Sequence, residues 1–580
     1  MAADNISQAG RQLYHTRIDS AYDADRDFAL GPWCFIGRED VFPGWEDLPF
    51  TDPFRGTHSL RRNADAVGDL VSFSIRRIGR ELNARHSTDH ELPFWWPLLV
   101  RWVANMTMAS WTRWVRLGEF VRDNGDAPIV TRIHSDPSSA HWDFRGTQEF
   151  FYHGIRTEAF EFWLQSCCIE AQAPAHWSLR RAPPEIATAP RPPIPEPPVS
   201  TNRLKRFVRR RIGRLAVSDI NGMGGWALPF SLYARLLRRR PGDAVFRAPA
   251  IETPPAIFPD DYLKILERLL AATMPATVTD RFGELQAAAR TRRYAPGRLA
   301  VTGAATSNDA NNFVMANAAE AGERIVRYQH GADYGTTACT TREWLAEYMD
   351  TAFLTWGWTA HDGHACRFVP VPSPALSRVA DKHIAKTRTV LMVGTRILLH
   401  QSSVGGEAPP AYAPVYRQEK VRFISALSPE ARADLLYRPY TRDPSDLEEV
   451  PYLERHLPGL AVHRGDFEPD MLACRLLVLD HLGTTLNIAM AANVPLVCYW
   501  HPDAYPVAAE AQPYFDALAD AGILFADAAG AANHVNDIHG DVTGWWRSPP
   551  VAAARRAWAD RFARSSWTWK WDWLRVLASL

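Results

Sequence analysis

The sequence predicts an α/β fold with parallel β-sheets, and three observations support this class. Residues 476–500 have the pattern of strand, polar turn, short helix and second strand, and both strands are apolar throughout. Such strands belong in a sheet that is covered on both faces. Strands and helices alternate in this way in two blocks, 290–360 and 385–530. The length of 580 residues also exceeds what one hydrophobic core usually holds, so we expect two or three domains.

Charge balance, cysteine spacing and apolar stretches exclude several classes of protein. Lys+Arg and Asp+Glu both total 65, so no net charge favours a nucleic-acid partner. The seven cysteines are scattered without a CxxC pair, which fits a reducing compartment and neither a disulfide framework nor a zinc site. The first 27 residues lack the apolar core of a signal peptide, and the most apolar stretch, 94–117, is interrupted by Arg101 and Arg113. We therefore expect a cytoplasmic protein.

The first 180 residues predict short strands and loops up to residue 60, then helices at 72–85, 96–123 and 149–170. The chain has 22 tryptophans, which we interpret mainly as core residues, although Trp faces also stack on sugar rings. An apolar run at 127–130 predicts a strand that leads to a polar loop with His134 and Asp136. These two are candidates for an acid/base pair, but a Ser-Asp-Pro turn near a His is more often structural.

A proline-rich and basic segment follows. Eight prolines between Pro183 and Pro198 exclude helix and sheet interior and predict an extended linker. The next run, Arg203 to Arg214, alternates basic and apolar residues. It predicts either a basic amphipathic helix in peripheral contact with anionic membrane or a solvated insertion without a partner.

The middle block places a histidine at a strand end. After helices at 226–240 and 260–274, the pattern predicts a strand at 298–303, a helix at 308–322, strands at 324–328 and 352–356, and a loop at 329–335 between those strands. His330 in this loop is followed by Gly331, which leaves room beside the imidazole. The position suits a general acid/base or a hydrogen bond to a diphosphate; a histidine that only caps the strand is the alternative.

The C-terminal block places cation and anion-binding groups at strand ends. A boundary at 370–385 precedes a strand at 389–394, a helix at 417–427 and a strand at 434–437 that leads to Arg438. Its guanidinium offers a planar fork for phosphate or carboxylate. A strand at 460–463 and a helix at 469–474 lead to the 476–500 unit, and helix 508–522, strand 523–526, helix 529–546 and Trp-rich helices at 551–580 complete the chain.

Thr484 and Thr485 stand at the predicted helix N-terminus of the 476–500 unit. Unpaired backbone N–H groups and the helix dipole favour an anion there, although Thr is common at the start of any helix. Ligands of parallel sheets bind where the carboxyl ends of strands converge. We therefore expect His330, Arg438 and this Thr pair to meet around one phosphate ester in a cleft between two domains.

Several motifs resemble those of transferases encoded in bacterial surface-polysaccharide and O-antigen loci. The motifs are Gly31-Pro32-Trp33, Gln329-His330-Gly331 with Gly335, Thr355-Trp356-Gly357-Trp358, Arg438-Pro439-Tyr440, Gly483-Thr484-Thr485 with Ala491–Pro495, Gln512–Asp516, Trp545-Trp546 and Arg561–Arg564. The resemblance spans most of the chain and implies a GT-B-like fold: two Rossmann-like domains facing a cleft, with a helical, Trp-rich N-terminal elaboration. Many GT-B donor domains have a Glu in the helix after the Thr pair, whereas this chain has Asn487 and Ile488.

The resemblance also implies an activity and its residues. It predicts a glycosyltransferase that moves a sugar from a nucleotide-activated donor, with a CMP-activated keto sugar as one candidate, to a glycan or lipid-linked acceptor. The alternatives are a CDP-polyol-phosphate transferase and a non-catalytic carbohydrate-binding scaffold. The catalytic candidates are His330, Asp333 and Asp136, and the donor-binding candidates are Gln329, Gly331, Arg438, Tyr440, Asp480, Gly483, Thr484 and Thr485.

The expected domains are an acceptor-side domain at 1–375, a nucleotide-sugar domain at 376–550 and helices at 551–580 that pack back on the body. No DxD pair stands at a strand end, so we expect neither a metal ion nor another cofactor.

Overall fold

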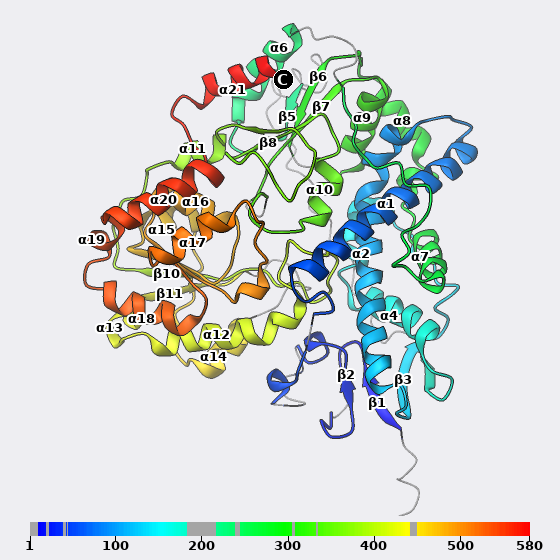
Figure 1. Cartoon of the computed structure of the whole chain (residues 1–580), viewed down its shortest axis with the longest axis horizontal. Coiled ribbons are helices and arrows are strands. Elements are labelled where there is room, and N and C mark those ends of the chain that lie inside the picture. Colours follow the sequence, from blue (N-terminus) through cyan, green and yellow to red (C-terminus); the bar gives the residue numbers. More distant parts are fainter. Residues whose placement is uncertain are drawn as a thin grey trace, which may run out of the picture.

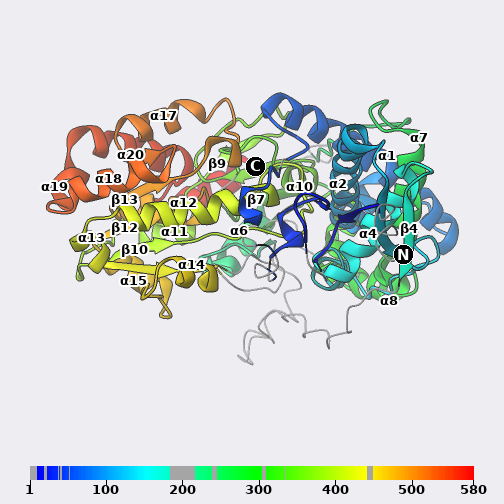
Figure 2. The same ribbon diagram turned by 90° about the horizontal axis from the view of Figure 1, so that it is seen from below.

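The computed structural model describes residues 10–18, 22–36, 38, 42, 44–50, 52–182, 216–237, 244–303, 308–331, 334–440 and 449–580. The strands in these ranges form three sheets, and every pairing between neighbouring strands is parallel. Helices surround the sheets, as Figures 1 and 2 show. The predicted α/β class with parallel sheets is therefore confirmed.

The C-terminal sheet has the strand order β11-β10-β12-β13-β14. Its strands are β10 (Val390–Val393), β11 (Leu435–Arg438), β12 (Leu476–Leu479), β13 (Leu496–Tyr499) and β14 (Leu524–Phe525). The central strands are buried along their whole length, as their apolar sequence predicts. The chain leaves β10 first to one side, for β11, and then to the other, for β12. This reversal makes the gap between β10 and β12 a topological switch point, where open α/β sheets bind ligands.

Ten α-helices follow β10 along the chain in the described ranges. They are α12 (Ala413–Ala426), α13 (Pro429–Ala433), α14 (Val450–His456), α15 (Phe467–Ala473), α16 (Thr484–Ala492), α17 (Gln512–Asp520), α18 (Ala528–Ile538), α19 (Val542–Arg547), α20 (Pro549–Phe562) and α21 (Trp569–Ser579). The predicted strand, helix and strand of residues 476–500 are present as β12, α16 and β13. The predicted helix 529–546 is instead two helices, and the predicted strand 460–463 is reduced to one bridge between Tyr437 and Val462.

The middle sheet has the sequential order β5-β6-β7-β8-β9. Its strands are β5 (Val217–Ser218), β6 (Leu299–Thr302), β7 (Arg324–Tyr328), β8 (Ala352–Thr355) and β9 (Phe368–Pro370). The helices of this region are α6 (Ala227–Leu236), α7 (Asp260–Ala272), α8 (Phe282–Arg290), α9 (Asp309–Glu320), α10 (Thr341–Glu347) and α11 (Pro374–Val379). The sequential order contains no switch point of the kind seen in the C-terminal sheet.

The N-terminal region contains a sheet that the sequence analysis did not identify. Its order is β2-β1-β3-β4, formed by β1 (Arg11–Tyr14), β2 (Phe28–Ala29), β3 (Ile129–His134) and β4 (Ser178–Ala182). The long helices α1 (Thr57–His86) and α2 (Leu92–Asn124) pack on each other, and α4 (Glu158–Gln172) packs on α2 and β3. The short α3 (Thr147–Glu149) precedes a turn of π-helix. The N-terminal elaboration is therefore not purely helical.

The last two helices connect the sheets. Helix α20 packs against α16 and α17, whereas α21 packs against α6 of the middle region. The indole of Trp573 in α21 donates a hydrogen bond to the carbonyl of Pro372 (2.9 Å) and lies against Tyr328 at the end of β7. The predicted boundaries at 375 and 550 stay predictions, because the packing runs across both positions. The proline-rich and basic segment 183–215 lies outside the described residues.

Candidate active site

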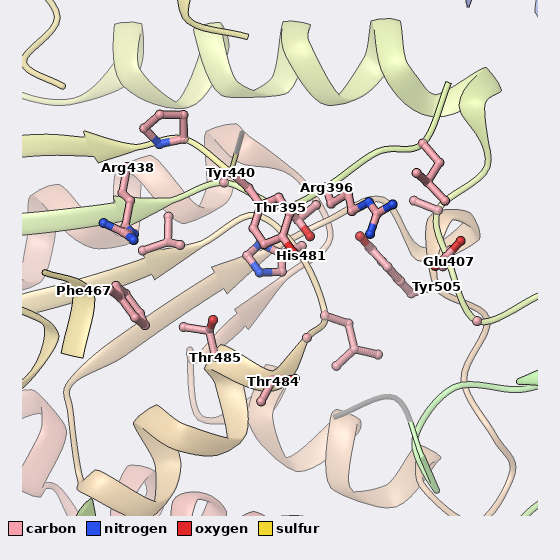
Figure 3. Close-up of a pocket in the computed structure, with 18 residues that line it drawn as sticks. Thr395, Arg396, Glu407, Arg438, Tyr440, Phe467, His481, Thr484, Thr485 and Tyr505 are labelled. Carbon is pink, nitrogen blue, oxygen red and sulfur yellow. The ribbon is translucent and has the colours of Figure 1, made fainter. Parts of the chain in front are cut away.

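A cavity of about 430 Å³ opens at the switch point of the C-terminal sheet. The ends of three neighbouring strands, β10, β11 and β12, all contribute to it. The lining residues are Val393, Gly394, Thr395, Arg396, Leu398, Gly406, Glu407, Ala408, Arg438, Pro439, Tyr440, Phe467, His481, Leu482, Gly483, Thr484, Thr485 and Tyr505. Figure 3 shows Arg438 and Phe467 on one side, Arg396, Glu407 and Tyr505 on the other, and the Thr pair at the start of α16.

Helix α16 begins beneath the cavity. Gly483 is the extended N-cap residue and gives no side-chain cap, so Thr484 and Thr485 occupy the first turn. Thr484 is exposed and Thr485 is half-buried. The first turn of a helix carries backbone N–H groups without helical partners and the positive end of the dipole. Both hydroxyls and these donors therefore lie where an anionic group in the cavity can reach them.

Arg438, the last residue of β11, adds positive charge at the cavity edge. Its guanidinium donates from Nη1 to His463 Nδ1 (2.9 Å) and to the carbonyl of Gly465 (3.0 Å). It also lies over the Phe467 ring, with 5.1 Å between the guanidinium carbon and the ring centroid. Since His463 Nδ1 accepts, its Nε2 carries the proton and donates to Asp470 (2.5 Å). These contacts hold Arg438 in a fixed place at the cavity edge.

A buried charge network lies beneath the cavity floor. Lys420 Nζ contacts Asp480 Oδ2 (2.9 Å) and both oxygens of Glu449 (2.6 and 2.8 Å). Asp480 also accepts from His481 Nδ1 (2.9 Å) and from the Tyr416 hydroxyl (3.1 Å). Burial alone would raise the pKa of Asp480, but Lys420 and His481 outweigh it and hold the pKa below its usual value. Asp480 is thus an ionised residue under the site that orients His481, whose ring lines the cavity.

The other side of the cavity is built from the loop between β10 and α12, residues 394–412. The N-terminal helices fix this loop from outside: Arg113 of α2 bonds to Glu161 (2.6 Å) and donates to the carbonyl of Gln401. Thr341, at the start of α10, donates to the carbonyl of Val404 (2.6 Å). The N-terminal region therefore shapes the cavity although it contributes no lining side chain among the described residues.

Glu407 brings a carboxylate to this side. It pairs with Arg342 of α10 (3.1 Å). Burial would raise the pKa of Glu407, but Arg342 and Arg396 outweigh it, so the carboxylate is ionised at neutral pH. The cavity thus holds fixed charges of both signs, with the positive groups concentrated around Arg438, Arg396 and the start of α16.

The loop after β7 approaches the same helix terminus from the middle sheet. A Cβ atom added to Gly331 would lie 3.5 Å from the Thr484 Oγ1 atom, so this loop passes close to the start of α16. His330 is adjacent and solvent-exposed, although it is not one of the lining residues. The structure therefore brings the His330 loop and the Thr pair together, and Arg438 lines the same cavity as the Thr pair.

Gln329 supports this loop from below. It is buried, its Nε2 donates to the carbonyl of Gly331 (2.6 Å), and its Oε1 accepts from the Trp356 backbone (2.9 Å) and the Trp358 indole (2.8 Å). Gly335 has φ of 74°, and a Cβ there would lie 2.6 Å from Trp358, so the position requires glycine. Gln329, predicted to bind the donor directly, instead holds the loop that carries His330.

His330 belongs to a hydrogen-bonded chain that runs into the core. Its Nδ1 lies 3.0 Å from the Tyr334 hydroxyl, which donates to Glu347 Oε2 (2.7 Å), and Glu347 Oε1 contacts Arg101 (3.2 Å). Because the Tyr334 proton goes to Glu347, its oxygen accepts from His330, which places the imidazole proton on Nδ1. The protein atoms packed around the imidazole, together with Arg101, lower the pKa of His330 to about 4, although part of the side chain stays exposed to solvent. The imidazole is therefore neutral at pH 7 and offers Nε2 as an acceptor.

Asp136, another catalytic candidate, lies apart from the cavity. It follows β3, which Figure 1 places on the far side of the molecule from the C-terminal sheet, and Figure 2 places the neighbouring strand β4 there too. Bonds from Ser139 and Ser138 lower its pKa to about 2, which makes it a weak base, and His134 Nδ1 accepts from the Asp136 backbone. Asp333 lies outside the described residues. Asn487, which replaces the glutamate of many GT-B proteins, accepts from the Trp558 indole (2.9 Å) and is buried.

Sequence reasoning identified the groups at strand ends but missed those on the long loop. Thr395 and Arg396 follow β10 directly, so their strand-end position was a usable signal. Glu407 and Tyr505 carry no such signal, because only the folded loops bring them to the cavity.

Metal-binding clusters and membrane-spanning helices are both absent from the described ranges. No group of three or more His, Cys, Asp or Glu residues in that part of the chain has the geometry of a metal site. None of the helices in those ranges combines the length and apolar composition that a bilayer crossing requires.

These features define an α/β protein with a polar cavity at a topological switch point. A family model described as LIC12162 family transferase matches residues 11–577, which is nearly the whole chain. The protein therefore belongs to the LIC12162 family of transferases, and it is an enzyme that moves a chemical group from a donor to an acceptor. No curated protein matches the chain.

Proposed function

We propose that this transferase is a GT-B-like glycosyltransferase that uses a nucleotide-activated sugar. The observation that carries the proposal is the cavity at the switch point, where Arg438, the Thr pair and the α16 N-terminus surround a space of about 430 Å³. That volume falls within the range of small-molecule sites, and the donor groups suit the phosphate of a nucleotide. Surface-polysaccharide synthesis at the cytoplasmic face of the membrane is the proposed setting, and a CMP-activated keto sugar remains one donor candidate.

In this proposal the C-terminal half binds the donor. The departing phosphate gains negative charge as the bond to the anomeric carbon breaks, and it keeps the bonding electrons. Arg438 and the N–H groups of the first turn of α16 are fixed before the reaction, so they stabilise this charge without reorganising. Thr484 and Thr485 add hydroxyl donors at the same place. The nucleotide base and ribose have room between Phe467 on one side and Tyr505 on the other.

His330 is the proposed catalytic base. The chain to Tyr334 and Glu347 keeps the proton on Nδ1, so Nε2 is free of that proton and can accept one from the acceptor hydroxyl. The acceptor oxygen then attacks the anomeric carbon as the phosphate leaves. The closeness of Gly331 to Thr484 supports this role, because the His330 loop then lies beside the proposed phosphate site.

A donor screen tests the proposal. Purified enzyme is incubated with CMP-, CDP-, UDP-, GDP- and dTDP-sugars that carry a label in the sugar and a second label in the phosphate nearest to it. Release of a nucleotide with transfer of the sugar label alone supports the glycosyltransferase. Transfer of both labels would identify a polyol-phosphate type of transferase instead.

Two variants assign the site in the same assay. We expect both His330→Ala and Thr484→Ala to lose the transfer activity. The control variant His176→Ala changes an exposed histidine between α4 and β4 and should keep wild-type activity. Full activity in both site variants would refute the site, and absence of turnover with every donor in the wild-type protein would refute the function.

A further inference from the structure

We propose that Glu407 binds two neighbouring hydroxyl groups of a ribose, so that the cavity at the switch point accepts ribonucleotides and rejects 2′-deoxyribonucleotides. This inference rests on the proposed function, in which that cavity holds the nucleotide. It adds the class of nucleotide that the site selects and the side chain that selects it. Glu407 is the one acidic residue among those that line the cavity in the described ranges.

The charged groups of the cavity are separated in space. Figure 3 shows Arg438 towards one end of the cavity and Glu407 towards the other. A phosphate is attracted by the guanidinium and by the N–H groups at the start of α16, and a carboxylate repels it. We therefore expect the phosphate of a bound nucleotide beside Arg438 and Thr484. Because the ribose is bonded directly to the phosphate, it is the uncharged part that comes next along the cavity.

The charges around Glu407 favour a neutral partner. Arg342 pairs directly with its carboxylate (3.1 Å), and Arg396 and Arg156 act on it from further away. A cationic group of a ligand would be repelled by these arginines, and an anionic group would be repelled by Glu407 itself. An uncharged group with hydroxyl donors therefore suits this end of the cavity.

The carboxylate has acceptor positions left for such a group. Each of its two oxygens can accept two hydrogen bonds. In the described contacts, Arg342 donates to Oε1 and the Ser403 hydroxyl donates to Oε2 (3.2 Å). The side chain is 31% exposed, and its neighbours on the cavity wall are the small residues Gly406 and Ala408. One remaining position on each oxygen matches two hydroxyls on adjacent carbon atoms, which is the arrangement of the 2′ and 3′ hydroxyls of ribose.

A tightly fitted turn presents Glu407. Gly405 and Gly406 precede it with φ of 79° each, a left-handed conformation that favours glycine. A Cβ atom on Gly405 would clash with the carbonyl oxygen of Cys339, so the turn packs directly on the segment before α10. Thr341 also donates to the carbonyl of the residue before Gly405 (2.6 Å). A carboxylate held in this way disfavours a ligand that lacks a hydroxyl, because one acceptor position then stays unpaired.

Calorimetric titration of the full-length protein tests the proposal with CMP, CDP, UDP and GDP and with the 2′-deoxy form of each. We expect the wild type to bind the ribonucleotide at least about tenfold more tightly than its 2′-deoxy form. In Glu407→Gln this ratio should fall below about threefold, since the amide is uncharged and forms weaker hydrogen bonds. The matched control Glu454→Gln changes an exposed glutamate of α14 that does not line the cavity, and it should keep the wild-type ratio.

Inorganic pyrophosphate distinguishes a lost ribose contact from a damaged site. It occupies the phosphate position without a sugar, so its affinity should not fall in Glu407→Gln, whereas it should fall in Arg438→Gln. A lower pyrophosphate affinity in Glu407→Gln would show that Glu407 only supports the structure of the cavity, and would overturn the proposal.

Other results of the titrations would also overturn it. Equal affinity of the wild type for ribonucleotides and their 2′-deoxy forms would refute selection by the ribose, although the nucleotide site of the proposed function would stand. A ratio in Glu407→Gln as large as in the wild type would assign the hydroxyls to another residue. A changed preference between CDP and UDP, with an unchanged preference for ribose, would show that Glu407 contacts the base. If the wild type binds no nucleotide, the proposed function fails and this inference fails with it.

Discussion

The C-terminal and middle sheets are both parallel and five-stranded in the described residues, yet their carboxyl ends differ in what they offer a ligand. The C-terminal order reverses at β10, and the polar residues at that reversal face a cavity. The middle order is sequential, and the polar residues after β7 bond to one another, with Gln329 and Tyr334 buried. In the proposed function, the C-terminal region therefore binds the donor and the middle region positions a single imidazole at the edge of that site.

The largest expected effect on the transfer rate comes from a substitution in the loop after β7 of the middle sheet. His330→Gln should lower the transfer rate by roughly 10²- to 10⁴-fold, because the proposed base is lost. Nucleotide affinity should stay within about twofold of the wild type, since His330 does not line the cavity. Steady-state kinetics and calorimetric titration measure the two quantities. An equal loss of affinity and rate would remove the division of roles between the two halves.

Arg438 tests the binding half. Arg438→Gln should weaken nucleotide binding by roughly 10- to 100-fold, because a hydrogen bond to a charged group contributes about 1.5–3 kcal/mol. Arg464→Gln, which changes an exposed arginine that does not line the cavity, is the matched control. Isothermal titration calorimetry with the best nucleotide gives both affinities. Equal affinities for the two variants would place the phosphate elsewhere.

Glu347 ends the hydrogen-bonded chain from His330 through Tyr334, and its burial predicts a pH-dependent free energy of unfolding. Burial raises the pKa of Glu347 from 4.5 to about 7, against the opposing effect of Arg101. Because the pKa of Glu347 is higher in the folded protein than in the unfolded chain, the protonated carboxyl contributes to the stability of the fold. This contribution is fully present below pH 4.5 and is lost as the pH rises through about 7. Glu347→Gln should remove this loss, which is on the order of 3 kcal/mol for a shift of that size.

Chemical denaturation at pH 5 and pH 8 measures the free energy of unfolding of both proteins. The wild type should lose stability relative to Glu347→Gln between these values. Parallel pH dependence in the two proteins would show that Glu347 titrates at its ordinary pKa and exerts no such pH-dependent effect.

Asp136 should give the smallest effect. Asp136→Asn is expected to change the transfer rate by less than about twofold, because a carboxylate already bonded by two serines is a weak base and lies away from the cavity. The same kinetic assay measures it. A loss comparable to that in His330→Gln would return Asp136 to the catalytic site.

The sequence predicted the fold best where apolar strands and turn residues alternate sharply. Residues 476–500 gave the order of β12, α16 and β13, and Arg438 was expected at a strand end and ends β11. Helix α1 was underestimated, because its first half, from Thr57, carries many polar residues between the buried Leu60, Ala64 and Val67. The predicted helix 529–546 is divided where Gly540 and the capping Asp541 interrupt it.

The sequence predicted only part of the candidate site, because some of its residues are brought there by contacts between distant segments. Groups at the end of a strand or at the start of the next helix, such as Arg438 and Thr484, are placed by the local sequence pattern. The opposite wall depends on contacts between distant segments: Arg113 holds the loop at Gln401 and Thr341 holds it at Val404. The N-terminal sheet was missed because its four strands are short and the two long helices separate them in sequence.

The most direct test of the central claim is a thermal-shift titration with free CMP, CDP, UDP, GDP and dTDP. Ligand that binds the native state raises its melting temperature by mass action. The account predicts that at least one nucleotide stabilises the wild type and Arg464→Gln by several degrees, and that none stabilises the combined variant Arg438→Gln, Thr484→Ala and Thr485→Ala. Equal stabilisation of that combined variant, or no response of the wild type to any nucleotide, would contradict it.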